Sequence, residues 1–320
     1  IEVAPYNLAA AVDPAPFDSV PGIGFDSDAS AAAIVPPAGR ITGSGRALAV
    51  DPAQNNAFRA INRAWKQGAA VQYAAGAPGK GGRYLIRGLS KSAQSALVGS
   101  LALVAERTAA SGTPLKRPRL GLYQPWSGSM DEGWTRWLLE QYGFEFVSLR
   151  PEDFHAPLRG KVDVIILADD ARIPVESMAS GQGARGAATR AVRPEYAYAL
   201  TADDIKGFEA FIRTGGTVVC FNAACRFAVQ QFKLPVKNAV EGLKAEEFFL
   251  RGSIVEVNVD ATHPVMAGMA EKAAVFVDGS PVFDLLEGFK GRVLAKYADT
   301  GSPLLSGYLI GEKYLYGKAA

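Results

Sequence analysis

The sequence predicts an α/β protein whose core is a doubly wound, mostly parallel β-sheet with helices on both faces. From residue 120 onward, short apolar runs alternate with single amphipathic helices, which is the pattern of a parallel sheet. The run at residues 162–168 is almost continuously apolar, which is typical of a strand buried on both faces. Composition agrees, because 48% hydrophobic and 21% charged residues in a chain of 320 indicate an ordinary globular protein.

The low net charge and the small numbers of cysteines and histidines argue against several functions. The 34 basic and 32 acidic side chains leave a net charge of +2, which is too small to indicate a nucleic-acid partner or an anionic membrane. Two cysteines cannot build a disulfide framework, and two histidines leave few ways to build a metal site. No apolar run approaches the ~18–20 residues that span a bilayer, so we expect no membrane span. The chain opens at Ile1 without a basic leader, so we expect no signal peptide in this segment and interpret both ends as cuts.

The N-terminal third divides into two predicted parts. Residues 1–45 are rich in Ala, Pro, Gly, Ser and Asp without a usable period, which indicates a linker or lead-in. In residues 46–117 a strand, a helix starting at Asn55-Asn56 and a second strand follow within about thirty residues, which predicts a βαβ extension packed on the main domain. The proline-rich residues 113–119 mark the joint.

Residues 118–320 are predicted to form the main domain. A strand at 120–123 leads through a loop into a helix whose stripe of Trp134, Trp137, Leu138 and Gln141 we expect to face the core. Residues 172–200 form an unusually long irregular stretch, which is typical of a functional insertion. Thr201 is expected to cap the helix that follows. Further strands are expected at 144–149, 162–168, 217–221, 254–259, 275–277, 292–297 and 303–310, and a further helix at 223–232.

Two sequence blocks carry a resemblance to a known family. Pro-Arg-Leu-Gly-Leu-Tyr-Gln-Pro-Trp at 118–126 and Met-Asp-Glu-Gly-Trp-Thr-Arg-Trp at 130–137 resemble the class I glutamine amidotransferase-like domain at the C-terminal end of large bacterial zinc carboxypeptidase-family proteins. Segments 232–238, 262–264 and 304–307 fit the same domain in the same order. The resemblance implies a flavodoxin-like fold, a further strand after Ala320, a secreted or periplasmic parent chain, and a peptidase domain upstream that would carry the zinc.

The zinc chemistry of that family is not expected in this segment. A catalytic zinc takes three protein ligands, and the family supplies a His-x-x-Glu pair and a distant His. Here Ala156, Pro157 and Leu158 follow His155, so the pair is absent and only His263 remains. We therefore expect no metal and no other cofactor in this chain.

The nucleophile of a working amidotransferase is also missing from its expected place. The fold presents a cysteine on the tight turn after a strand, where helix amides lower its pKa and a histidine activates it. The turn after 217–221 reads Asn222-Ala223-Ala224. Cys220 precedes it inside the strand, and Cys225 follows two or three residues late, so two small buried thiols are expected. A hydrolase or amidotransferase that uses Cys225 with His263 as base is the alternative, although His263-Pro264 is also typical of a hydrogen-bonded turn.

A third hypothesis is a peptide- or glycan-binding module. Trp126 and Ser127 lie in the loop after the first main-domain strand, where open α/β sheets bind ligands. Arg185, in the long insertion, could close over an anion, although such segments are more often solvated loops. The sequence thus leaves three interpretations, of which a non-catalytic accessory domain that partners an upstream peptidase domain is the first.

Overall fold

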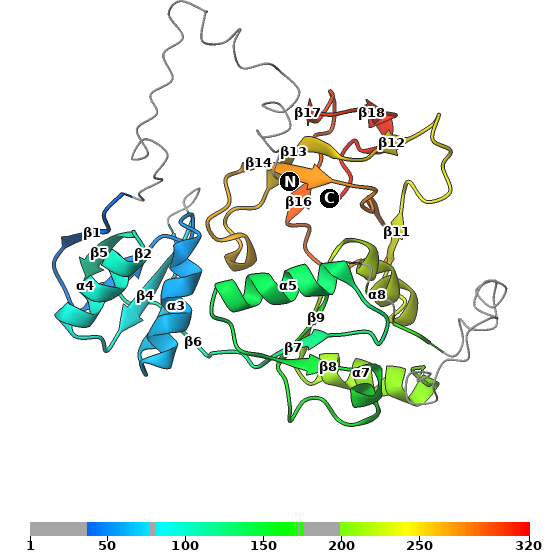
Figure 1. Ribbon diagram of the computed structural model, residues 1–320. Coiled ribbons are helices and arrows are strands. Elements are labelled where there is room, and N and C mark those ends of the chain that lie inside the picture. The colour runs from blue at the N-terminus through cyan, green and yellow to red at the C-terminus, as the bar shows by residue number, and fades with distance from the viewer. Residues whose placement is uncertain (1–36, 77–80, 170, 172, 176–198) are drawn as a thin grey trace, which may run out of the picture. The chain divides into compact units, whose positions relative to one another are not determined.

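The structure is a computed structural model that describes residues 37–76, 81–169, 171, 173–175 and 199–320. Residues 39–320 form one unit, and of residues 1–38 only Pro37 and Ala38 are described. The strands fall into three groups along the chain, shown from blue to red in Figure 1, and each group has its own cluster of buried side chains. Arg185 and nearly all of the predicted long insertion lie outside the described residues.

The first group is a six-stranded sheet with two helices. Strands β2 and β3 each pair antiparallel with β4, and β5 pairs antiparallel with β2. The two strand–helix–strand units are β2-α3-β3 and β4-α4-β5. Strand β4 therefore lies between the two strands of the first unit, and β2 lies between the two strands of the second. This is the split βαβ arrangement of ferredoxin-like folds. The order is β1-β5-β2-β4-β3-β6, with β1 parallel to β5. The elements are β1 (Arg40–Gly43), β2 (Ala47–Val50), α3 (Asn56–Lys66), β3 (Ala70–Ala74), β4 (Arg83–Arg87), α4 (Lys91–Ser100), β5 (Val104–Thr108) and β6 (Thr113–Leu115).

The predicted βαβ unit is therefore present in a split form, and the structure adds three details that the sequence analysis did not give. Strand β1 lies inside residues 1–45, which were expected to be irregular. Helix α3 packs on the sheet mainly through its alanines at 57, 60 and 64, since small side chains let a helix approach a sheet closely. Asn55 precedes α3, but its side chain makes no capping hydrogen bond.

The second group is a parallel four-stranded sheet in the order β10-β9-β7-β8. Numbered along the chain this order is 2-1-3-4, which is the flavodoxin-like order. Because right-handed crossovers lead from β7 to one side and from β9 to the other, α5 and α7 cover opposite faces. The predicted fold class, a flavodoxin-like α/β protein, is confirmed. The elements are β7 (Leu120–Tyr123), α5 (Met130–Gln141), β8 (Phe146–Leu149), η1 (Pro151–His155), β9 (Val164–Leu167), α7 (Ala202–Arg213), β10 (Thr217–Cys220), η3 (Asn222–Ala224) and α8 (Cys225–Gln231).

One face of this sheet carries a dense aromatic core. Phe208 of α7 is 1% exposed and stacks on Phe154 of η1, with ring centroids 5.1 Å apart. The N-terminus of α7 is fixed by a capping box: the Thr201 hydroxyl accepts a hydrogen bond from the Asp204 amide, and the Asp204 carboxylate accepts one from the Thr201 amide. The predicted Thr201 cap is confirmed, and it aligns the helix so that Phe208 and Phe211 reach the core.

The other face is covered by α5, and here the sequence prediction is wrong. Trp134, Trp137 and Leu138 were expected in the core, but their exposed fractions are 61%, 52% and 50%. The side chain of α5 that is buried is Glu132, which pairs with Arg136 one turn later. An apolar stripe predicts that a helix has an apolar face, but it does not predict which face meets the sheet.

The third group is antiparallel. Strand β13 pairs with β14, β16 and β17, and two short pairs join β11 to β15 and β12 to β18. The sequence predicted most of these strands but not their antiparallel pairing. The elements are β11 (Val236–Asn238), β12 (Phe249–Leu250), β13 (Ser253–Val259), η4 (Pro264–Met266), β14 (Lys272–Val277), β15 (Phe283–Leu285), β16 (Ala295–Lys296), β17 (Leu304–Ser306), β18 (Leu309–Ile310) and η5 (Glu312–Tyr314).

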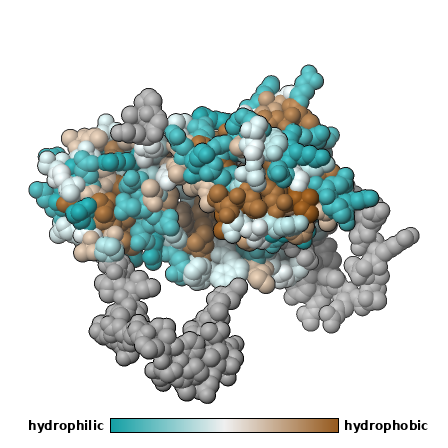
Figure 2. Space-filling model, turned by 90° about the horizontal axis from the view of Figure 1, so that it is seen from above, coloured by the Kyte–Doolittle hydropathy of each residue, from teal (hydrophilic) through white to brown (hydrophobic). Residues whose placement is uncertain are grey.

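Apolar side chains also stand on the outer face of this antiparallel group. Ile254 of β13 and Phe276 of β14 are register partners, and they are 39% and 69% exposed. Figure 2 shows apolar side chains gathered over part of one face of the molecule, between hydrophilic areas.

Candidate functional site

The carboxyl ends of the four parallel strands define the candidate site. Polar or aromatic side chains follow every strand at this edge: Trp126 after β7, Arg150 and Glu152 after β8, Asp169 after β9, and Asn222 after β10. In open α/β sheets ligands bind outside the carboxyl ends of the strands, where the strand order reverses. That reversal lies between β7 and β9. Sequence analysis singled out Trp126, named Asn222 only as a residue that cannot act as the nucleophile, and missed Asp169, Arg150 and Glu152.

The turn after β10 is where a nucleophile is expected from the sequence, but its residues are Asn222, Ala223 and Ala224. Asn222 adopts the left-handed conformation, with φ of +44°, which asparagine tolerates better than most residues. Its Nδ2 donates to Asp169 Oδ2 at 2.6 Å, and the Ala223 amide donates to Asp169 Oδ1 at 3.0 Å. The backbone N–H that could stabilise a developing oxyanion is thus already bonded to a carboxylate, which disfavours a second anion there.

The two thiols sit on either side of this turn. Burial and the neighbouring Cys225 raise the pKa of Cys220 to about 12. Burial and, to a lesser extent, the Asp169 carboxylate also raise the pKa of Cys225, whose Sγ donates to the Cys220 carbonyl at 3.4 Å. A reactive thiol needs a lowered pKa. Both thiols are therefore protonated near neutral pH, as two partly buried core thiols would be.

His263 lies in the antiparallel group and has a structural role. It precedes η4, and its Nδ1 accepts a hydrogen bond from the Val265 amide at 3.2 Å. This is the hydrogen-bonded turn that the sequence suggested. Within the described residues, no hydrogen bond or ion pair joins His263 to Cys225. Their use as a catalytic pair stays a prediction without a supporting contact.

Trp126 lies in a cluster of charged side chains. Its indole Nε1 donates to Glu152 Oε2 at 3.0 Å, and the Arg150 guanidinium lies over its ring, 4.1 Å from the centroid. Arg150 Nη1 also donates to the Pro125 carbonyl at 3.1 Å. These contacts hold the ring at the edge of the sheet, with 37% of Trp126 exposed and Ser127 exposed beside it. Of the predicted ligand residues, the structure places these two at the site, and Arg185 lies outside the described residues.

The described residues hold neither a cluster of metal ligands nor a membrane-spanning helix. Among them there is no group of three or more His, Cys, Asp or Glu side chains placed to hold a metal ion. His155 instead contacts Asp204 of the α7 capping box, with Nδ1 3.1 Å from Oδ1. In the same part of the chain, no helix has the length and apolarity to cross a bilayer.

Comparisons with known proteins identify no family. No protein-family model and no curated protein matches the chain. Among solved structures, it is similar to a protein described as one of the GMP synthase subunits of Thermoplasma acidophilum, at 11% identity and a TM-score of 0.34, over 57% of this chain and 75% of that one. It is also similar to a ThuA-like protein from Bacteroides uniformis, at 14% identity and a TM-score of 0.31, over 63% and 79%. At such TM-scores the fold assignment rests on the strand order observed here.

Proposed function

We propose that this chain is a catalytically silent glutamine amidotransferase-like domain that serves as an accessory module. The observation that carries the proposal is the turn after β10, where Asn222 takes the nucleophile's place and the Asp169 carboxylate bonds to the Ala223 amide. The raised pKa values of both thiols support it, because a silent domain has no need of a thiolate.

The proposal also concerns the longer protein to which this domain would belong. The blocks at 118–126 and 130–137 resemble the C-terminal domain of secreted zinc carboxypeptidase-family proteins. On that resemblance, a metallocarboxypeptidase domain upstream performs proteolysis with its own zinc, outside the cytoplasm, and this domain is its partner. Sequencing the native gene upstream of Ile1 tests this: a His-x-x-Glu motif is expected there, and its absence would refute the parent assignment.

Thiol alkylation tests the silent-domain proposal directly. A pKa of about 12 in place of 9.0 lowers the thiolate fraction of Cys220 about 1,000-fold near neutral pH. Native protein treated with iodoacetamide at pH 7.5 should therefore label both cysteines far more slowly than urea-unfolded protein, as read by mass spectrometry. Fast labelling of Cys225 in the native protein would instead favour the alternative, a hydrolase or amidotransferase that uses Cys225 and His263.

Activity assays on the variants Cys225→Ser and His263→Gln provide a second test of the silent-domain proposal. Serine preserves the hydrogen bond to the Cys220 carbonyl, and glutamine keeps a side-chain acceptor for the Val265 amide, so both variants should fold. A silent domain shows no glutaminase or esterase activity that either substitution removes. An activity lost in both variants, with circular dichroism unchanged, would overturn the proposal.

The exposed Trp126 favours a second candidate, a peptide- or glycan-binding module. The ring is already ordered by Arg150 and Glu152, so a ligand would lose little side-chain entropy on stacking against it. If the candidate is right, Trp126→Ala abolishes binding to peptidoglycan fragments. Trp134→Ala, which removes another exposed indole, is the matched control and should leave binding unchanged.

A further inference from the structure

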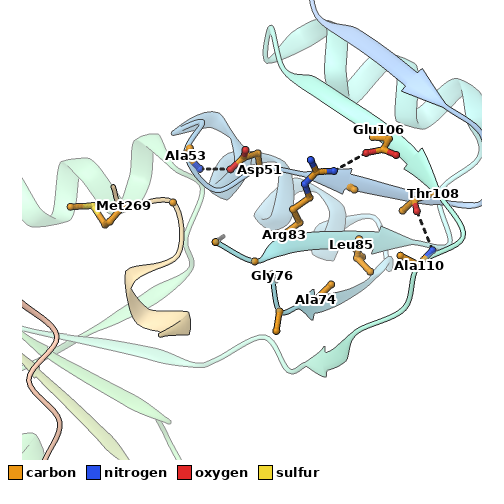
Figure 3. A pocket seen from close by; sticks show the side chains of 15 residues that line it. Asp51, Ala53, Ala74, Gly76, Arg83, Leu85, Glu106, Thr108, Ala110 and Met269 are labelled. Atoms are coloured by element: carbon orange, nitrogen blue, oxygen red, sulfur yellow. Dashed lines mark hydrogen bonds and ion pairs between the residues drawn. The ribbon is translucent and has the colours of Figure 1, made fainter. Parts of the chain in front are cut away.

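The first sheet has a cavity on the face that carries no helix. Helices α3 and α4 pack on the side of Leu48, Val50 and Ile86, so the alternate residues of β2 and β4 face the other way. On that side lies a cavity of about 580 Å³, seen in Figure 3. Its volume is within the range of small-molecule sites, roughly 300–1,000 Å³.

Small residues make up much of the lining of this cavity. Its apolar lining includes Ala49 of β2, Ala74 of β3, Leu85 of β4 and, from the loop after η4, Met269. Gly82 lines it at the entrance to β4, and a Cβ at that position would lie 2.3 Å from the Tyr73 hydroxyl oxygen and 2.6 Å from the Ala74 carbonyl oxygen. No side chain fits there without moving the strand, because such distances are well inside van der Waals contact. Glycine is thus required at residue 82, where the chain enters β4 close to Tyr73 and Ala74.

Three charged side chains line the same cavity. Arg83 Nη1 lies 2.7 Å from Glu106 Oε2, and both side chains are about half exposed. Asp51 Oδ1 accepts a hydrogen bond from the Ala53 amide at 2.9 Å, and within the described residues Asp51 forms no ion pair. The lining therefore has one positive and two negative charges, and it leaves an uncompensated carboxylate.

We propose that this cavity binds a short peptide with free termini and one additional positive charge. The ligand's carboxylate pairs with Arg83, whose guanidinium has five N–H donors and can bind two carboxylates at once. Its terminal ammonium pairs with Glu106. Its cationic side chain pairs with Asp51, and its aliphatic carbons lie on the methyl groups of Ala49 and Ala74. Every charge of ligand and cavity is then matched, which neither a neutral nor an acidic peptide achieves. The proposal goes beyond the function proposed above and does not rest on it.

Calorimetry with the dipeptide Ala-Lys tests the proposal. Three modified peptides each remove one charge: N-acetyl-Ala-Lys lacks the ammonium, Ala-Lys amide lacks the carboxylate, and Ala-Lys acetylated at Nζ lacks the side-chain cation. Three matched variants remove the corresponding protein charge: Glu106→Gln, Arg83→Gln and Asp51→Asn. Asparagine keeps the oxygen that accepts from the Ala53 amide, so this variant should fold as the wild type does.

We expect Ala-Lys to bind the wild-type protein with a dissociation constant below about 1 mM, and each single charge removal to weaken binding about tenfold or more. Because Asp51 is proposed to pair with the lysine side chain of the ligand, the Asp51→Asn variant should bind Ala-Lys and its Nζ-acetylated form with equal affinity. Arg63→Gln is the control, because Arg63 lies on α3 and bonds Ser100 on the helical side of the sheet. Absence of Ala-Lys binding to the wild type, or an equal loss in Arg63→Gln, would overturn the proposal.

Discussion

Asp169 is predicted to hold the turn after β10, and its removal should be costly. Its carboxylate accepts hydrogen bonds from Asn222 Nδ2 and from the Ala223 amide. Hydrogen bonds to a charged group contribute about 1.5–3 kcal/mol each, and the partly exposed position favours the lower value. Asp169→Ala should therefore lower the free energy of unfolding by about 3 kcal/mol. Asp169→Asn keeps one acceptor oxygen and should cost about half as much.

Urea unfolding followed by tryptophan fluorescence measures this change. Three of the four tryptophans, at 126, 134 and 137, belong to the parallel-sheet group, so the signal reports on the part of the chain that Asp169 stabilises. Asp203→Ala is the matched control: its side chain is 87% exposed and pairs with Lys206 at the surface, so it should cost less than about 1 kcal/mol. If Asp169→Ala is no more destabilising than Asp203→Ala, the carboxylate does not hold the turn and the argument for a blocked oxyanion site fails.

Further predictions concern the same sheet. Trp134→Ala and Trp137→Ala should each change the free energy of unfolding by less than about 1 kcal/mol because both rings are exposed, whereas Phe208→Ala should cost about 3–5 kcal/mol; calorimetry or urea titration distinguishes them. Thr201→Ala removes the hydroxyl that accepts from the Asp204 amide and donates to the Asp204 carboxylate, and it should cost about 1 kcal/mol in the same titration. Hydrogen bonds from Arg119 and Arg159 hold the pKa of Asp163 well below its usual range, so its stabilising effect is complete above about pH 4 and is lost as pH falls further. In Asp163→Asn, the urea midpoint should fall less between pH 5 and pH 3 than in the wild type; an identical fall would contradict the assignment.

Much of the fold could be predicted from the amino-acid sequence alone. The apolar runs that became β7, β9 and β10 and the cap at Thr201 are local signals, because a strand buried on both faces must be apolar and a helix N-terminus needs an acceptor. The absence of a nucleophile at residues 222–224 is also read directly from the sequence.

The tertiary structure decided which surfaces meet. Asp169 and Asn222 are 53 positions apart, and they are neighbours only because β9 and β10 are adjacent parallel strands that end at one edge. The tryptophan stripe of α5 has the same period whether it faces a core or solvent, so its exposure could not be predicted from the period. The split βαβ pairing likewise requires β4 to lie between β2 and β3. This order depends on contacts between residues that are distant in the chain, so local sequence does not predict it.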